Sequence, residues 1–126
     1  MRIECLIVGA ALASACGSNA TTPTPSPCSS GPTTTTITIL NNAVCPQNIT
    51  VPPGSQVLFV NQDTIAHEMY SDPHPAHTDC PELNQVGHLE PGQRRLTGNL
   101  NTARTCGFHD HIHFDIAALK GTITIQ

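Results

Sequence analysis

The sequence predicts an all-β domain, an antiparallel Greek-key β-sandwich or barrel, and two observations support this fold class. Short segments in which apolar and polar residues alternate recur along the chain, for example residues 36–40 and 121–126. They are separated by clusters of Thr, Ser, Pro and Gly, which favour strands and turns over helices. Short strands at this spacing are typical of sandwiches and barrels, so residues 36–126 are expected to form one such domain.

The pattern also places the individual strands. Residues 56–61 are apolar on both faces, which predicts a central strand, whereas residues 93–97 are expected at a sheet edge. Residues 72–92 form a long excursion with one helical turn at 82–85, and a loop of that length in a small domain is commonly functional. The expected strands span residues 36–40, 48–51, 56–61, 67–71, 93–97, 104–109 and 121–126. The expected core comprises Ile37, Ile39, Ile49, Val51, Val57, Phe59, Leu96, Phe108, Ile123 and Ile125.

The amino-acid composition excludes one class of function and points to the histidines. The chain has 126 residues, a formal net charge of −4 and no basic cluster. Nucleic-acid-binding proteins carry a basic patch, so this class is excluded. The chain also contains seven histidines, an unusual number for its length, and they require an explanation.

Residues 1–15 are expected to be a signal peptide. Arg2 precedes the apolar run 5–12, which is too short to span a membrane as a stable helix. Small residues then lead to Cys16, a pattern that resembles a bacterial lipoprotein signal with Cys16 as the lipidated first residue of the mature chain. An ordinary signal peptide cut nearby is the alternative. Either route exports the protein to the cell envelope, where disulfides are permitted.

Residues 16–35 are rich in Thr, Pro and Ser and lack apolar periodicity. Such a segment cannot bury a core, so a disordered linker is expected. It would hold the domain away from the membrane, which the protein would contact only through the lipid anchor.

One thiol and three imidazoles fall within residues 105–113, namely Cys106, His109, His111 and His113. Thiolate and neutral imidazole are ligands that copper and zinc prefer. The spacing from Cys106 is C-x2-H to His109 and C-x4-H to His111. This segment therefore predicts a metal site, for which the upstream strands supply a scaffold and one further ligand.

Three stretches resemble the cupredoxins, the plastocyanin- and azurin-like copper domains. Residues 49–63, followed by His67, are similar to the family's strand, glycine turn, apolar strand ending in Asn and His ligand. Residues 89–93 resemble its L-x-P-G-x turn, and residues 119–123 resemble its closing M-x-G-x-I strand. Together these stretches extend the resemblance over roughly residues 36–126.

The resemblance implies a copper site in which His67 is one ligand, and a Cys and a second His come from the loop before the last strand. Such a centre exchanges one electron between Cu(I) and Cu(II), and its potential is tuned by the axial residue. Leu119 stands where the family often has an axial Met. A blue copper site with this leucine is expected to have a raised potential.

Two registers of the Cys–His segment remain open. In the first, Cys106 is the copper thiolate, and His109 or His111 is the second imidazole. In the second, Phe108 is the core aromatic residue before the family's Cys, and Asp110 occupies the Cys slot. The segment then resembles the aromatic-H-x-H motif of multicopper oxidase domains, and Asp110 could accept a hydrogen bond from a His ring and fix its tautomer.

The cysteines bear on this choice. With Cys16 lipidated, Cys28, Cys45, Cys80 and Cys106 remain in the mature chain. Cys28 could pair with Cys45, which leaves Cys80 with Cys106, and a disulfide sulfur is not the thiolate of a blue site. If Cys106 is instead a ligand, Cys80 is free or pairs with Cys28 or Cys45.

The expected function is that of an exported protein that binds one copper ion and transfers single electrons to or from an unidentified redox partner. It is expected to be a monomer and not an enzyme, since no catalytic triad, phosphate loop or carboxylate pair is evident. The alternative is a non-redox, His-rich domain that sequesters copper, or zinc, with Cys106 in a disulfide. The excursion with His74, His77 and His88 is either plain surface or a loop that captures additional metal.

Overall fold

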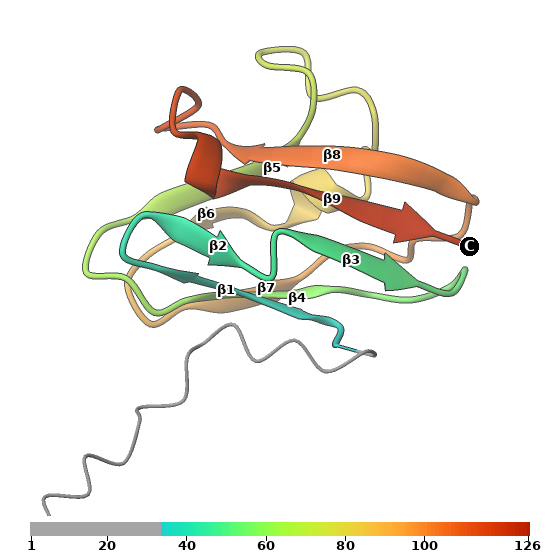
Figure 1. Cartoon of the computed structure of the whole chain (residues 1–126), viewed down its shortest axis with the longest axis horizontal. Helices are drawn as coiled ribbons and strands as arrows, with labels where there is room; N and C mark the ends of the chain where they lie inside the picture. The colour runs from blue at the N-terminus through green and yellow to red at the C-terminus, as the bar shows by residue number, and fades with distance from the viewer. Residues whose placement is uncertain (1–33) are drawn as a thin grey trace, which may run out of the picture.

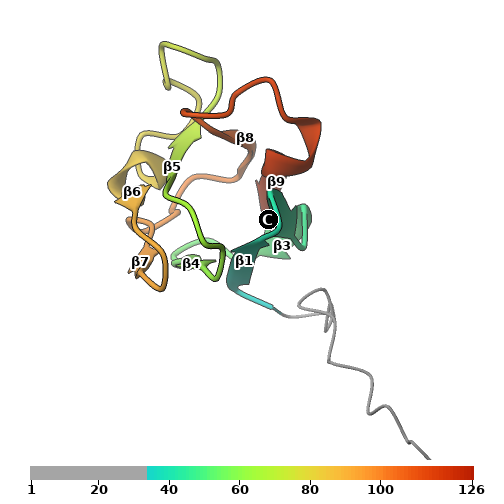
Figure 2. The ribbon, with the colours of Figure 1, turned by 90° about the vertical axis from the view of Figure 1, so that its left-hand side faces the viewer.

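The computed structural model describes residues 34–126, which form two β-sheets around a common interior (Figures 1 and 2). This architecture confirms the predicted all-β sandwich. The strands are β1 (Thr36–Leu40), β2 (Ala43–Cys45), β3 (Asn48–Val51), β4 (Leu58–Asn61), β5 (His67–Ser71), β6 (Gly87–Leu89), β7 (Arg94–Leu96), β8 (Arg104–Asp110) and β9 (Lys120–Ile125), with 3-10 turns η1 (Leu83–Gln85) and η2 (Ala117–Leu119). The predicted signal peptide, Cys16, Cys28 and nearly all of the predicted linker lie outside the described residues.

One sheet has the strand order β2-β1-β4-β7 and the other β3-β9-β8-β5-β6. Most neighbouring strands are antiparallel, as predicted, but β1 pairs with β4 and β3 pairs with β9 in parallel. Because β5 and β8 run antiparallel, Met69 lies opposite Asp110 and Tyr70 lies opposite His109. This register brings the start of β5 and the end of β8 to the same end of the sandwich, the end that faces the viewer in Figure 2.

The core lies between the two sheets. Phe59 and Phe108 are fully buried and meet edge to face, with their ring centroids 5.3 Å apart. Every residue of the predicted core is buried except Leu96, which is 45% exposed. Leu96 lies on β7 at the edge of its sheet, where only one neighbouring strand covers it. Its prediction as a core residue is therefore wrong.

Two short strands were not predicted from the sequence pattern. The strand β2 lies in a region expected to be a turn, and β6 lies inside the expected excursion. Each has three residues, too few to show a clear alternation, and each forms through pairing with its neighbour β1 or β5. Among residues 34–126, no helix is long and apolar enough to cross a membrane.

Candidate metal centres

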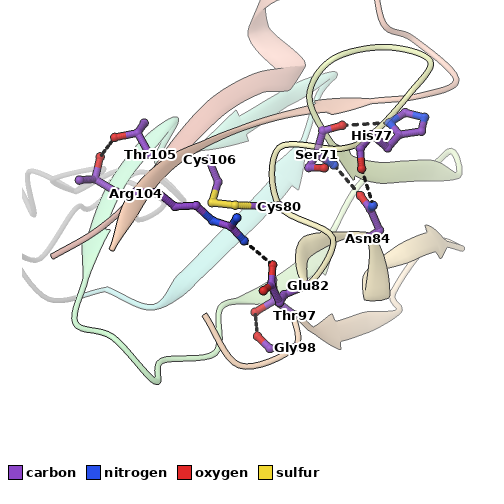
Figure 3. The surroundings of a disulfide bond; sticks show 11 residues. Ser71, His77, Cys80, Glu82, Asn84, Thr97, Gly98, Arg104, Thr105 and Cys106 are labelled. Carbon is purple, nitrogen blue, oxygen red and sulfur yellow. Dashed lines mark hydrogen bonds and ion pairs between the residues drawn. A yellow bond between two sulfur atoms is a disulfide. The ribbon is translucent and has the colours of Figure 1, made fainter. Parts of the chain in front are cut away.

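Cys106 does not supply a thiolate. Its sulfur is bonded to that of Cys80, so β8 is covalently joined to the middle of the excursion (Figure 3). Both cysteines are fully buried. A disulfide sulfur cannot act as an anionic ligand, and the first register, with Cys106 on copper, is therefore wrong. Cys45 also takes part in a disulfide bond, and its predicted partner Cys28 lies outside the described residues.

The histidines form two separate groups of potential metal ligands. His67 lies with Asp110 and His113, which we call the inner site. A second group, which we call the outer site, consists of His74, His77, His109 and His111. The structure thus separates His67 from His109 and His111, which were expected to share one ion. The cause is the alternation of β8: Asp110 faces the interior while its neighbour His109 faces outward.

In the inner site, two imidazoles converge on a single carboxylate oxygen. The Nδ1 atoms of His67 and His113 lie 2.6 Å and 2.9 Å from Asp110 Oδ2, respectively. His67 begins β5, Asp110 ends β8, and His113 follows in the next loop. The side chains of His67 and Asp110 are fully buried, whereas that of His113 is 30% exposed. The site is thus closed on the inside and reaches the surface through His113.

Asp110 is held as a carboxylate despite its burial. Its Oδ1 accepts hydrogen bonds of 3.0 Å from the backbone N–H groups of Glu68 and Ile112. Burial alone would raise the pKa of Asp110, but the hydrogen bonds from Glu68, His67, His113 and Ile112 together hold that pKa below its usual value. The carboxylate is therefore charged and fixed in orientation.

Asp63 orients His67 from the other side. Its Oδ2 lies 3.2 Å from His67 Nε2 and also accepts from the backbone N–H of Asn42 at 2.8 Å. Burial raises the pKa of Asp63, but backbone hydrogen bonds from Asn42 and Thr64 and the contact with His67 lower it below the usual value. If a metal ion displaced the proton that His67 Nδ1 donates to Asp110, Asp63 would hold the remaining proton on Nε2, and Nδ1 would then be available as a ligand. Sequence reasoning missed Asp63, although its i,i+4 spacing to His67 was an available signal.

Leu119 closes the inner side of the loop that carries His113. The loop contains two turns, in which Ile116 N–H donates to His113 O and Leu119 N–H donates to Ile116 O, each at 3.0 Å. Leu119 is fully buried and belongs to the main core cluster. It offers no donor atom, so the inner site offers two nitrogen donors and one oxygen donor. This donor set fits Cu(II) or Zn(II), and its three donor atoms lie within 4.8 Å of one another.

His88 belongs to neither site. It is exposed on β6, where Nδ1 lies 3.2 Å from Glu68 Oε1 and Nε2 lies 2.8 Å from Glu90 Oε1. Of the three histidines in the excursion, His74 and His77 are therefore the two that reach a potential metal site.

No protein-family model and no curated protein matches this chain. Solved structures do match it. A purple cupredoxin from Nitrosopumilus maritimus is 18% identical, with a TM-score of 0.56 over 72% of this chain and 98% of that chain. The oxidised form of plastocyanin from Dryopteris crassirhizoma is 26% identical, with a TM-score of 0.55 over 72% of this chain and 99% of that chain. Amicyanin from Paracoccus versutus is 13% identical, with a TM-score of 0.57 over 78% of this chain and 86% of that chain.

These matches agree with the two-sheet architecture. The chain has the cupredoxin fold.

Proposed function

We propose that this protein binds one copper ion at the inner site and transfers single electrons. The observation that carries the proposal is the buried, charged carboxylate of Asp110, held between His67 and His113 in a cupredoxin fold. The structure favours the second register. Phe108 and Asp110 are two residues apart on β8, so they lie on the same face of the strand, and both are fully buried. Asp110 then takes the position of the cysteine that the resemblance implied, and Leu119 takes the axial position.

Copper would supply the one-electron couple between Cu(I) and Cu(II). The protein contributes a rigid donor set: backbone N–H groups fix Asp110, and Asp63 fixes His67. Met69 and Leu119 are fully buried and exclude water from the core below the site. A donor set held in this way changes little between the two oxidation states of the ion, which favours rapid electron exchange.

His113 is partly exposed, whereas His67 and Asp110 are fully buried, so an electron would leave the inner site through the His113 ring. Its neighbours Ile112 and Phe114 are large apolar residues that are 46% and 49% exposed. They offer an apolar contact area for a redox partner protein. We propose that the chain is a monomeric carrier that meets its partner at this surface, rather than an enzyme.

The absence of a thiolate alters the expected properties of the copper. A carboxylate is a harder ligand than a thiolate and favours Cu(II), so the raised potential expected for a blue site with Leu119 no longer follows. Without a thiolate, the intense visible charge-transfer band of a blue site should also be missing. The protein with Cu(II) should be weakly coloured.

The test is a redox titration of the copper-loaded full chain, followed by electron paramagnetic resonance. We expect the Cu(II) signal of the inner site to disappear and return reversibly, and to be missing in a His113→Gln variant. A signal that cannot be reduced and reoxidised while the ion stays bound would refute electron transfer. It would favour the second candidate, non-redox holding of copper or zinc, which the nitrogen and oxygen donor set also suits.

We further propose export to the cell envelope and lipidation at Cys16. The signal-like residues 1–15 support this, and a disulfide such as Cys80–Cys106 suits an oxidising compartment. Mass spectrometry of the mature N-terminus would test it. We expect a lipid-modified Cys16 and no lipid in a Cys16→Ser variant, whereas an unmodified mature N-terminus would contradict the lipoprotein assignment.

A further inference from the structure

A second group of metal donors lies on the opposite side of β8 from the inner site. His109 is near the end of β8 and His111 follows it, while His74 and His77 come from the loop after β5. The four imidazoles each offer one nitrogen, and these nitrogens lie within 4.8 Å of one another. Ring centroids are 5.0 Å apart for His77 and His109, and 4.7 Å apart for His74 and His111.

Two of these rings are oriented by hydrogen bonds on their outer nitrogens. His109 Nδ1 donates to Asp72 Oδ1 at 2.6 Å, and His77 Nδ1 donates to the carbonyl of Ser71 at 2.9 Å. Both Nε2 atoms are therefore left with a lone pair. A histidine ligand typically has this arrangement, in which a carboxylate or carbonyl holds the proton on the far nitrogen.

The lone pair of His109 has no partner. His109 is only 2% exposed, and its Nε2 is buried without a hydrogen bond. A buried polar atom of this kind is costly unless something satisfies it. Nearby, His77 Nε2 and His111 Nδ1 lie 3.0 Å apart and must share one proton, which a metal ion would displace.

The excursion is fixed firmly enough to hold this geometry. Its middle is joined to β8 by the Cys80–Cys106 disulfide, and at its start Asp72 N–H donates to Gly107 O at 3.0 Å. Asn84 accepts from the Ser71 N–H and donates to the His77 carbonyl at 2.8 Å (Figure 3).

Because Gly107 has no side chain, it leaves room for the Asp72 carboxylate. A side chain at residue 107 would collide with the Asp72 carboxylate that orients His109. The loop, the disulfide and this glycine thus all position the same four rings.

The outer site is open to solvent on one side. His74 is exposed and stacks on Phe114, with centroids 4.3 Å apart and planes at 8°. Partial desolvation, followed by the nearby rings of His111, His109 and His77, lowers the pKa of His74 below its usual value. Because the His74 ring borders the solvent, an ion can enter the outer site past it.

We propose that His74, His77, His109 and His111 form a second metal site, separate from the inner site, that binds Cu(II) more tightly than Zn(II). Four neutral imidazoles suit either ion, but nitrogen ligands bind Cu(II) more strongly in the usual affinity order. In a four-coordinate complex with metal–nitrogen distances near 2.0–2.1 Å, neighbouring donors would be roughly 3 Å apart. The present spread requires only a small inward movement, for which the exposed His74 is suited.

The test is Cu(II) binding to the metal-free full chain by equilibrium dialysis, with electron paramagnetic resonance to separate the two sites. We expect two ions per chain for the unaltered protein. A His77→Gln/His111→Gln double variant should lose one ion and keep the signal of the inner site. His74→Gln, which alters an exposed side chain and leaves the fold intact, should weaken the same ion. Asp72→Asn should lower its affinity about 10–100-fold, as expected for loss of an orienting carboxylate.

His88→Gln is the matched control, because His88 is an exposed histidine outside both sites, and it should leave copper binding unchanged. Unchanged copper binding in both the double variant and His74→Gln would overturn the proposal, as would tighter binding of Zn(II) than Cu(II) at these residues. The two proposals can fail separately. If a single ion is bound and is lost only with His77 and His111, the outer site stands and the inner copper site is refuted.

Discussion

At the scale of single residues, one carboxylate determines what kind of metal site the interior can form. Asp110 occupies the last inward position of β8, where it receives four hydrogen bonds and remains charged although it is fully buried. A buried charge is tolerated only when it is paired and hydrogen-bonded. Asp110 fulfils this condition without a metal, and it would also fulfil it with one.

Replacement of Asp110 by Asn should keep the shape of the inner site and remove its charge. We expect the affinity for copper at this site to fall more than about 100-fold, which is beyond the effect typical of residues that only orient a ligand. Competition with a chelator would measure it. Asp115→Asn is the control, since Asp115 is an exposed carboxylate in the same loop. An unchanged affinity in Asp110→Asn would contradict the ligand role.

His88 should make stability depend on pH in a defined direction. Hydrogen bonds to Glu90 and then to Glu68 raise the pKa of His88 above its usual value. The folded state therefore favours the charged ring, and its contribution to stability is complete below the unfolded pKa of about 6.5 and is lost as pH rises through the folded value. Unfolding of the native protein and of His88→Gln should show a difference that shrinks with increasing pH. A difference that grows with pH would contradict this.

At the scale of elements, β8 carries candidate ligands of both sites, His109 and Asp110, and its neighbours set its position. It pairs with β9 on one side and with β5 on the other, and the disulfide joins it to the excursion. The alternation of this single strand distributes its residues between the core and the outer face. The same alternation places one candidate metal site on each side of it.

Gly121 on β9 should not tolerate a side chain. It lies opposite Phe108 in the register, and a Cβ there would collide with the Gln47 carbonyl oxygen and with the Phe108 ring. The backbone carbonyl cannot move aside cheaply, so Gly121→Ala should destabilise the fold by about 1–3 kcal/mol, as overpacking usually does. Denaturant unfolding would measure this. Thr124→Ala on the same strand should cost less, and an equal cost would argue against the steric explanation.

Removal of the disulfide should affect both stability and the outer site. Cys80 and Cys106 are 26 residues apart, so the loop they close predicts a loss of roughly 3–4 kcal/mol in a Cys80→Ala/Cys106→Ala variant. The excursion would then be held by fewer contacts, and copper binding by the outer site should weaken more than binding by the inner site. Calorimetric titration of the variant would compare the two. Equal weakening would show that the bond acts on the whole domain instead.

At the scale of the whole molecule, the cupredoxin sandwich places both candidate sites near one end. The inner site lies between the sheets, where β5 begins and β8 ends, and the outer site lies beneath the excursion. His113 and Phe114 belong to the same loop, and Phe114 stacks on His74 of the outer site. A single exposed loop thus borders both groups of ligands.

The sandwich, most of its core and a segment that holds several candidate metal ligands could be predicted from the sequence. Strand alternation is a local property, so residues such as Ile37, Phe59 and Phe108 could be assigned to the core without the structure. The short strands β2 and β6 and the exposure of Leu96 could not, because they depend on which strands become neighbours.

The grouping of the candidate ligands, in contrast, depends on tertiary contacts. Cys106 could have been a thiolate ligand until Cys80 was brought to it from the excursion. His67 joined Asp110 and His113, and His74 and His77 joined His109 and His111, through contacts between segments distant in the chain. Spacing along one segment fixes which side of a strand a residue faces, but it does not fix which other segment packs against that side.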